Sequence, residues 1–309
     1  MKINIIRKKY WYFLISLIVI IPGIISLILF GLNLSVEFTG GSNLTFAFPS
    51  KVSNKELKQI SSVFTQNKVK IQNITASGNQ VLIKSQPVSQ SQDILITGEL
   101  KKDLGNFDQQ SYETIGPTIG AETLQNAIYA LIVASILIVL YITWSFRSVP
   151  KPTSSFRFGV CAIIALIHDV LVLIGLFSIF GHFFGIEVDS LFVTAVLTVI
   201  GFSVHDTIVV FDRIRENLRR VGGENFAEVV NDSILQTLDR SLNTSLTVVL
   251  VLIGLLIFGG DTIRWFVVAL LIGIISGTYS SIFNASPLLV VWQDLIQRGF
   301  SLKNIKLKK

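Results

Sequence analysis

The sequence has little charge, almost no cysteine and few histidines. Only 15% of its 309 residues are charged and 50% are hydrophobic, with a mean hydropathy of +0.63. A soluble protein of this size usually carries about a quarter charged residues, so a water-soluble enzyme is nearly excluded. A single cysteine excludes an intramolecular disulfide framework and a thiolate metal cage. We expect Cys161 to be a small apolar residue within a helix.

Long apolar runs occupy most of the chain. A membrane span needs about 20 apolar residues to cross roughly 30 Å of hydrocarbon. The stretches that qualify are 11–32, 125–145, 158–181, 190–211, 242–260 and 264–292. The first run follows basic residues, as in a signal peptide, but it is too long for an h-region and no small-residue cleavage site follows it. We therefore interpret it as a retained span and predict six transmembrane helices.

Basic residues gather in three short flanks. There are four basic residues in the N-terminus, three in the 146–157 loop and five in the C-terminal tail. The 182–189 loop, in contrast, has two acids and no Lys or Arg. Short loops rich in Lys and Arg stay in the cytoplasm, so both termini are predicted to be cytoplasmic and the 33–122 region to lie outside. The net charge of +6 is then a topology signal, and we expect no nucleic-acid partner.

The predicted extracytoplasmic domain, 33–122, shows an α+β pattern. Strand patterns occur at 43–48, 69–75, 79–85 and 107–114. Two helices between them begin at Ser53 and Ser89 with capping boxes. The order βαββαβ predicts a ferredoxin-like fold. Because lysines and acids balance here and no His or Cys is present, we expect a binding or lever domain without a catalytic site.

The other predicted parts are helical. The cytoplasmic N-terminus and first span form 1–32, a five-span region covers 123–292, and a basic cytoplasmic tail follows at 293–309. Within the five-span region, 212–240 breaks at Gly222–Gly223 and then shows apolar residues at helical spacing. This pattern predicts an amphipathic segment that lies on the membrane surface or packs under the bundle.

Ionisable residues within the spans are few. Each costs at least about 2.5–3.5 kcal/mol at a helix centre, so each must face the bundle interior or a wet cavity. His168 and Asp169 lie in the third span, His205 and Asp206 in the fourth, and Arg240 opens the fifth. Each histidine is either a relay or ligand group or, more simply, a neutral hydrogen-bonded residue.

Three spans carry polar or small residues at helical spacing, which should face other helices or water. The fourth-span stripe comprises Thr194, Thr198, Gly201 and His205, and the fifth-span stripe comprises Arg240, Asn243, Thr244 and Thr247. The sixth span has small residues that let a neighbouring helix approach closely: Gly273, Ser276, Gly277, Ser280, Ser281 and Asn284.

Asp206 and Arg240 are natural partners. If they can separate, Asp206 can hold a proton in one state and be ionised in the other, which would couple proton movement to a conformational change. The alternative is a static ion pair that fixes helix register.

Two classes of membrane enzyme do not fit. An intramembrane aspartyl protease would carry Gly-x-Gly-Asp, but Asp206 follows Ser-Val-His. A metal hydrolase would need more ligands than His182 adds, and no His-Glu-x-x-His occurs. We therefore predict no catalytic residue, no metal and no cofactor beyond a proton gradient.

Stretches along the whole chain resemble the SecF family of bacterial protein-export subunits, half-units related to the resistance-nodulation-division transporters. The matching stretches are Val36–Gly41, Ile115–Gly120, His168–Asp169, Ser203–Asn217, Arg240–Thr247 and Gly277–Phe283. Ser203–Asn217 is the specific one. Glu37 stands where the family usually has Asp, which keeps the charge.

The resemblance implies partners and an energy source. A SecF subunit forms a heterodimer with SecD and uses the proton gradient to help pull unfolded polypeptides out of the SecYEG channel. It is a multi-pass protein, in contact with membrane lipid, of the bacterial plasma (inner) membrane or a thylakoid membrane. The alternatives are a proton-coupled small-molecule or lipid exporter of the related superfamily and a non-conducting scaffold.

The resemblance also implies roles for residues. It assigns proton coupling to Asp206 and Arg240, with Asp169 as a weaker candidate. The supporting polar groups would be His205, His168, Thr198, Asn243, Thr244 and Thr247. Gly40–Gly41 and Gly116–Pro117 resemble hinge positions where the outside domain joins the bundle, although they would serve equally well as turns.

Overall fold

The computed structural model describes residues 4–147, 149–150, 153–221 and 225–297. The predicted break at Gly222–Gly223 and the basic tail from Arg298 lie outside these ranges. The chain divides into two compact units. One, the helical bundle, comprises residues up to Asn33 and from Leu131 onward, and the other, the sheet unit, is Leu34–Ala130.

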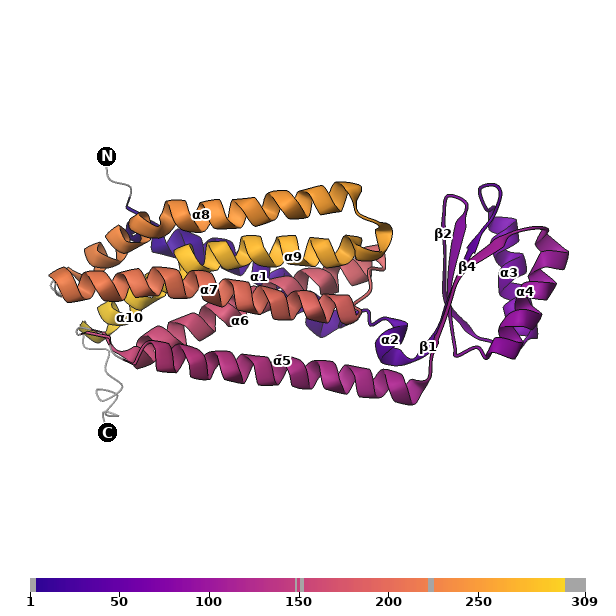
Figure 1. The fold of residues 1–309 in the computed structure, drawn as a ribbon, viewed down its shortest axis with the longest axis horizontal. Helices are drawn as coiled ribbons and strands as arrows, with labels where there is room; N and C mark the ends of the chain where they lie inside the picture. Colours follow the sequence, from indigo (N-terminus) through magenta and orange to yellow (C-terminus); the bar gives the residue numbers. More distant parts are fainter. Residues whose placement is uncertain (1–3, 148, 151–152, 222–224, 298–309) are drawn as a thin grey trace, which may run out of the picture. The chain divides into compact units, whose positions relative to one another are not determined.

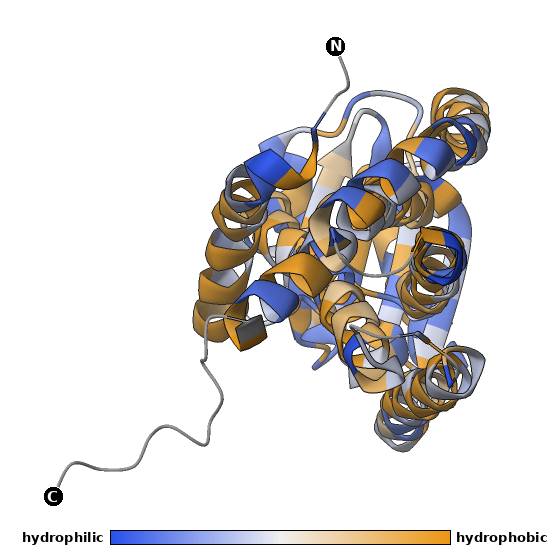
Figure 2. Cartoon of the chain, turned by 90° about the vertical axis from the view of Figure 1, so that its left-hand side faces the viewer, coloured by the Kyte–Doolittle hydropathy of each residue, from blue (hydrophilic) through white to orange (hydrophobic). Residues whose placement is uncertain are grey.

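Six helices in the described part of the chain are long and apolar enough to cross a membrane, which confirms the predicted number. Five are α1 (Lys9–Phe30), α5 (Pro117–Ser145), α6 (Ser155–Phe184), α7 (Ser190–Val221) and α8 (Phe226–Phe258) (Figure 1). The sixth joins α9 (Asp261–Ser280), the π-helical turn η2 (Ser281–Ala285) and α10 (Ser286–Gln297), and a 3₁₀ turn, η1 (Ile6–Lys8), precedes α1. Figure 2 shows that the long helices are hydrophobic along most of their length, as helices that satisfy their own backbone in lipid must be.

Residues 212–240 comprise the ends of two long helices. α7 continues to Val221 and α8 begins at Phe226. Apolar residues of α8 such as Phe226, Val230 and Ile234 are buried, and Asn217 Nδ2 on α7 donates to Ser233 Oγ on α8 at 2.9 Å. Ion pairs one turn apart, such as Arg220–Glu216 at 2.6 Å, support the extension of α7.

Three spans form the centre of the bundle. In their most apolar windows, α6 and α7 bury 50% of residues and the sixth span buries 61%, whereas α1, α5 and α8 bury 17% or less. The polar residues of α6, α7 and α9 are therefore the ones that protein encloses on several sides. α8 is mostly exposed in that window, although its Ser241 and Ser245 are buried.

Small residues let α1 cross α6 closely. A Cβ atom added to Gly175 would lie 2.8 Å from Gly23 Cα, and one added to Gly23 would lie 2.9 Å from Gly175 Cα. One turn further along each helix, the hydroxyls of Ser26 and Ser178 form a hydrogen bond of 2.9 Å. Close backbone approach with a small polar contact is a usual way to join helices in lipid.

The sheet unit has the predicted βαββαβ order. Its elements are α2 (Val36–Thr39), β1 (Gly41–Ala47), α3 (Asn54–Gln66), β2 (Ile71–Ser77), β3 (Gln80–Ser85), α4 (Gln90–Leu104) and β4 (Asp108–Ile115). The sheet is antiparallel with the order β2-β3-β1-β4. Both capping boxes are present, at Ser53 with Glu56 and at Ser89 with Gln92. The hydrogen bonds from Ser53 lower the pKa of the Glu56 carboxyl.

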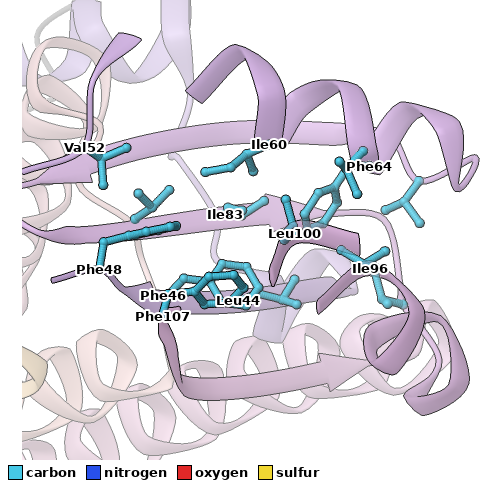
Figure 3. Packing of buried hydrophobic residues seen from close by; sticks show 14 residues of the cluster. Leu44, Phe46, Phe48, Val52, Ile60, Phe64, Ile83, Ile96, Leu100 and Phe107 are labelled. Carbon is cyan, nitrogen blue, oxygen red and sulfur yellow. The ribbon is translucent and has the colours of Figure 1, made fainter. Parts of the chain in front are cut away.

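One face of the sheet packs on both helices (Figure 3). Alternate residues of β1, Leu44 and Phe46, are fully buried, as period-two side chains on the core face of a strand should be. They meet Ile60 of α3 and Ile96 of α4 in a single apolar cluster. The opposite face carries uncharged polar pairs such as Ser111 and Thr45, whose hydroxyls lie 3.0 Å apart.

The glycine contact between α1 and α6 yields a test. We expect Gly175→Leu to push α1 away from α6, break the Ser26–Ser178 hydrogen bond and lower stability by about 1–3 kcal/mol or more, as overpacking does. The matched control is Gly254→Leu on α8, where an added Cβ meets nothing within 4 Å. Thermal aggregation of the detergent-solubilised protein measures both, and equal midpoints for the two variants would contradict the expectation.

Candidate functional site

α7 presents two different polar faces. Its stripe of Thr194, Thr198, Gly201 and His205 is exposed at the surface of the bundle. Asp206, the next residue, is rotated about 100° from that stripe and is buried, with 3% of its surface exposed. The structure therefore separates the predicted stripe from the carboxylate beside it.

Asp206 lies among hydroxyl groups. Ser241 and Ser245 of α8 and Thr278 of α9 lie beside its carboxylate, and the Ser245 and Thr278 hydroxyls share a hydrogen bond of 2.6 Å. No group of the described chain donates to the buried Oδ2 of Asp206, and the buried Ser241 Oγ also lacks a hydrogen-bond partner. The hydrogen bonding around Asp206 is therefore incomplete in this state.

Arg240 does not pair with Asp206. No ion pair joins these two residues in the part of the chain that the structure describes, and Arg240 is exposed. The rest of its stripe, Asn243, Thr244 and Thr247, is exposed as well. Thr244 Oγ1 donates to the Arg240 carbonyl at 2.9 Å, so this side chain satisfies itself on its own helix. Arg240 directly precedes Ser241 in α8. Ser241 faces the Asp206 carboxylate, so Arg240 is one residue away from the α8 position that faces its predicted partner.

Asp169 of α6 is fully buried and fully hydrogen-bonded. Its Oδ1 accepts from His168 Nδ1 at 2.9 Å and from Ser276 Oγ at 2.8 Å. Its Oδ2 accepts from Ser203 Oγ at 2.5 Å and from Ser280 Oγ at 2.6 Å. The donors come from α6, α7 and α9, so one carboxylate joins the three central spans.

The two histidines of the spans differ. His168 is mostly buried, and the hydrogen bond from its Nδ1 to Asp169 leaves Nε2 buried without a partner among the described residues. Its ring also stacks near Tyr279, with centroids 6.5 Å apart. His205, in contrast, is exposed on the α7 stripe.

Close helix packing makes these contacts possible. A Cβ added to Gly273 would lie 2.1 Å from a Val199 methyl, and one added to Gly277 would lie 3.0 Å from Ser203 Cβ. The small residues of the sixth span thus bring α9 against α7, as predicted. Beyond α9, Ser281 shares a hydrogen bond of 2.8 Å with Thr207, and Asn284 Nδ2 donates to Ser16 Oγ of α1 at 2.8 Å.

Sequence reasoning missed four of the polar contacts. Ser203, Ser276 and Ser280 bind Asp169 and Thr278 faces Asp206, but the serines of the sixth span were interpreted only as small packing residues. The spacing of Ser276 and Ser280, one turn apart on the sixth span, could have indicated that both hydroxyls bind one polar group on a neighbouring span, such as an aspartate. Nothing in the spacing indicated which aspartate they would reach.

The predicted hinge residues form a close-packed junction within the sheet unit. Gly40 and Gly41 have φ of +73° and +145°, values that favour glycine. A Cβ on Gly40 would lie 2.7 Å from Pro117 Cα, and one on Gly120 would lie 2.7 Å from Gly40 N, whereas Gly116 has open space around it. The structure therefore explains the glycines as turn and contact residues, and the hinge role stays a prediction.

Among the described residues, no group of three or more His, Cys, Asp or Glu side chains could hold a metal ion. The site consists of two buried carboxylates, the hydroxyls around them and an exposed polar face with one arginine. Such a site can bind and release a proton.

Comparison with known proteins assigns the family. The family model described as "Protein export membrane protein SecD/SecF, C-terminal" matches residues 96–295, and the model described as "SecD/SecF GG Motif" matches residues 25–48. A protein translocase subunit SecF from Thermobaculum terrenum is 47% identical over 302 residues, which cover 94% of each chain. The chain belongs to the SecF family.

Longer relatives named SecDF match this chain as well. A protein translocase subunit SecDF from Bacillus subtilis is 34% identical, with 93% of this chain and 37% of the relative covered. The crystal structure of SecDF from Thermus thermophilus, described as a translocon-associated membrane protein, matches with a TM-score of 0.81 and 31% identity. The match covers 95% of this chain and 39% of that one. The GG-motif match includes Gly40 and Gly41, and the larger match includes Asp169, Asp206 and Arg240.

The contact between α7 and α9 can be tested by second-site rescue. We expect Gly273→Ala to destabilise the bundle by about 1–3 kcal/mol, because the added methyl overlaps the Val199 side chain. Val199→Ala removes the overlapping methyl groups, so the double variant Val199→Ala/Gly273→Ala should recover part of the loss. Thermal midpoints of the purified single and double variants measure this, and additive losses would contradict a direct contact.

Proposed function

We propose that this protein is the SecF-type half of a proton-driven protein-export unit. It pairs with a SecD-type subunit and acts beside the SecYEG channel on unfolded polypeptides as they leave the cytoplasm. The observation that carries the proposal is Asp206, a carboxylate enclosed by α7, α8 and α9 with one oxygen that lacks a donor among the described residues. It lies next to an exposed polar face.

The exposed polar face supports a partner bundle. The two stripes, on α7 and α8, place hydroxyls, an imidazole, an amide and a guanidinium on the outside of apolar spans. The threonine hydroxyls of these stripes donate to carbonyls of their own helices. Lipid cannot satisfy the imidazole, the amide and the guanidinium, whereas side chains of another helix bundle can. About 60% of the chain of the SecDF relatives lies beyond the part that this protein matches, and a SecD-type half is the natural partner for the face.

The positions of Asp206 and Arg240 support proton coupling. An ionised Asp206 attracts Arg240, and a protonated one does not. Because Ser241 faces the carboxylate and Arg240 precedes it, a rotation of α8 by one residue, about 100°, would exchange the two side chains. One charge that crosses 100 mV is worth roughly 2.3 kcal/mol, which is enough to bias a two-state element.

Contacts at one end of the bundle support the proposed topology. Lys9 at the start of α1 binds Asp294 of α10 at 2.6 Å, and Asn231 of α8 accepts from Ile5 N at 2.8 Å. Arg157 at the start of α6 donates to Gln293 at 2.6 Å. The starts of α1 and α6 and the end of α10 thus lie at one end of the bundle, and by the positive-inside rule this end is cytoplasmic. The sheet unit then lies on the outer side, where a lever or binding domain could act on an emerging chain.

Asp206→Asn tests the proton role. We expect it to abolish the gradient-dependent part of export and to spare the ATP-driven part, because an amide cannot bind and release a proton. Translocation of a secreted polypeptide into inverted membrane vesicles, with and without a gradient, measures both parts. Asp212→Asn, an exposed aspartate on the same helix, is the matched control and should retain the gradient response. Undiminished gradient-dependent export by Asp206→Asn at normal protein levels would contradict the proposal.

Site-specific cross-linking tests the partner face. In a Cys161→Ala background, we expect Thr244→Cys on α8 to cross-link to a SecD-type subunit in native membranes, because the polar face should be covered there. The control is Ile132→Cys, which is exposed on α5 in an apolar surface suited to lipid. Cross-linking from α5 alone, with none from α8, would show that the partner covers a different side.

A further inference from the structure

The two buried carboxylates of the bundle differ in how completely they are hydrogen-bonded. Asp169 has two donors on each oxygen. Donors to the charged form of a carboxylate stabilise that form. Asp206 Oδ2 has no donor in the described chain, and the nearby Ser241 Oγ has no partner there either. A proton on Asp206 Oδ2 could be shared with Ser241, whereas a proton on Asp169 would have to displace an existing donor.

α9 lies between the two carboxylates. Ser276 and Ser280, one turn apart on α9, donate to Asp169. Thr278 is two residues from each, about 200° around the helix, and it faces Asp206 together with Ser245. One face of α9 is therefore fixed to Asp169, and the opposite face contributes to the surroundings of Asp206.

We propose that Asp169 is a positioning residue and not a second proton carrier. It holds α9 through Ser276 and Ser280, and thereby sets where Thr278 lies relative to Asp206. The proposal rests on the proton role proposed for Asp206 and divides the work between the two aspartates. It also revises the expectation, carried over from the family resemblance, that Asp169 takes part in proton coupling.

Close packing of α9 against α7 limits how far α9 can move relative to Asp169. α9 approaches α7 at Gly277, which lies against Ser203, and Ser203 itself donates to Asp169. A rotation of α9 would break the hydrogen bonds of Ser276 and Ser280 at once. The titratable groups recorded near the two carboxylates are His168 beside Asp169, with Tyr279 stacked near that imidazole, and His205 beside Asp206.

The first experiment replaces each aspartate by asparagine. At position 169 the new side chain would keep one carbonyl oxygen as an acceptor for the serines and could donate to others through its amide, but it could not carry a proton. We expect Asp169→Asn, which loses the acceptor of two of the four hydrogen bonds, to weaken gradient-dependent export without abolishing it, and Asp206→Asn to abolish it. Asp169→Leu, which removes every acceptor, should lose assembled protein. Complete loss of gradient-dependent export in assembled Asp169→Asn would overturn the proposal.

The second experiment reads the protonation of Asp206 directly. A hydrophobic carbodiimide labels protonated carboxyls in membranes, and peptide mass mapping locates the label on the full chain in complex with its partner. We expect labelling at Asp206 with a pH midpoint that shifts upward in Ser276→Ala/Ser280→Ala, because a displaced Thr278 stabilises the ionised carboxylate less. Ser135→Ala on α5 is the control and should leave the midpoint unchanged.

The outcomes separate this proposal from the proposed function. An unchanged midpoint in the double serine variant, or a label at Asp169 in Asp206→Asn, would overturn the positioning role while the proton role of Asp206 stands. Full gradient-dependent export by Asp206→Asn would instead overturn the proposed function. A shifted midpoint together with a retained gradient response in Asp169→Asn supports the division of roles.

Discussion

The structure depends on the hydrogen bonding of a carboxylate buried among transmembrane helices. Hydrocarbon supplies no donors, so a carboxylate there is tolerated only where protein provides them. Asp169 finds them on three helices at once. Removal of one partner from such a network costs more than the hydrogen bond itself, because the remaining groups stay buried. The central spans are thus held in register by a polar contact, although nearly all the surface around it is apolar.

The small residues of the bundle follow from this constraint. A serine side chain is short, so its helix must approach the aspartate closely before the hydroxyl can reach it. Gly273 and Gly277 allow close approach between α9 and α7, which both supply serine donors to Asp169. Gly23 and Gly175 allow close approach between α1 and α6, where Ser26 and Ser178 form a hydrogen bond. In water such glycines would weaken a helix by about 1 kcal/mol each. In this bundle the glycines allow the helices to approach closely enough for serine hydroxyls to form the hydrogen bonds that water would form outside the membrane.

Much of the fold could be predicted from the sequence, because it depends on local patterns. Apolar length fixed the six spans, and two capping boxes with alternating strands predicted the βαββαβ unit. The helical spacing in 212–240 left open whether the segment lies on the membrane surface or packs under the bundle, and it could not show that two long helices, with ion pairs one turn apart, extend beyond the apolar zone. At the site, helical spacing correctly grouped Arg240 with Asn243, Thr244 and Thr247. It could not tell that this stripe faces outward or that Ser276 serves Asp169, because both depend on how helices distant in sequence pack.

The contrast between the two carboxylates indicates where movement can occur. α6, α7 and α9 meet at Asp169 and enclose it completely, so a rearrangement among them would break several charge-assisted hydrogen bonds together. α8 differs from these helices: only 17% of the residues in its most apolar window are buried, and its Ser241 Oγ lies near Asp206 with no hydrogen-bond partner among the described residues. A change of charge at Asp206 is therefore accommodated most easily by α8. The exposed face of α8 carries Arg240 and the rest of its polar stripe. A movement of α8 would therefore change the contacts between this stripe and the partner that covers it, while the contacts around Asp169 stay in place.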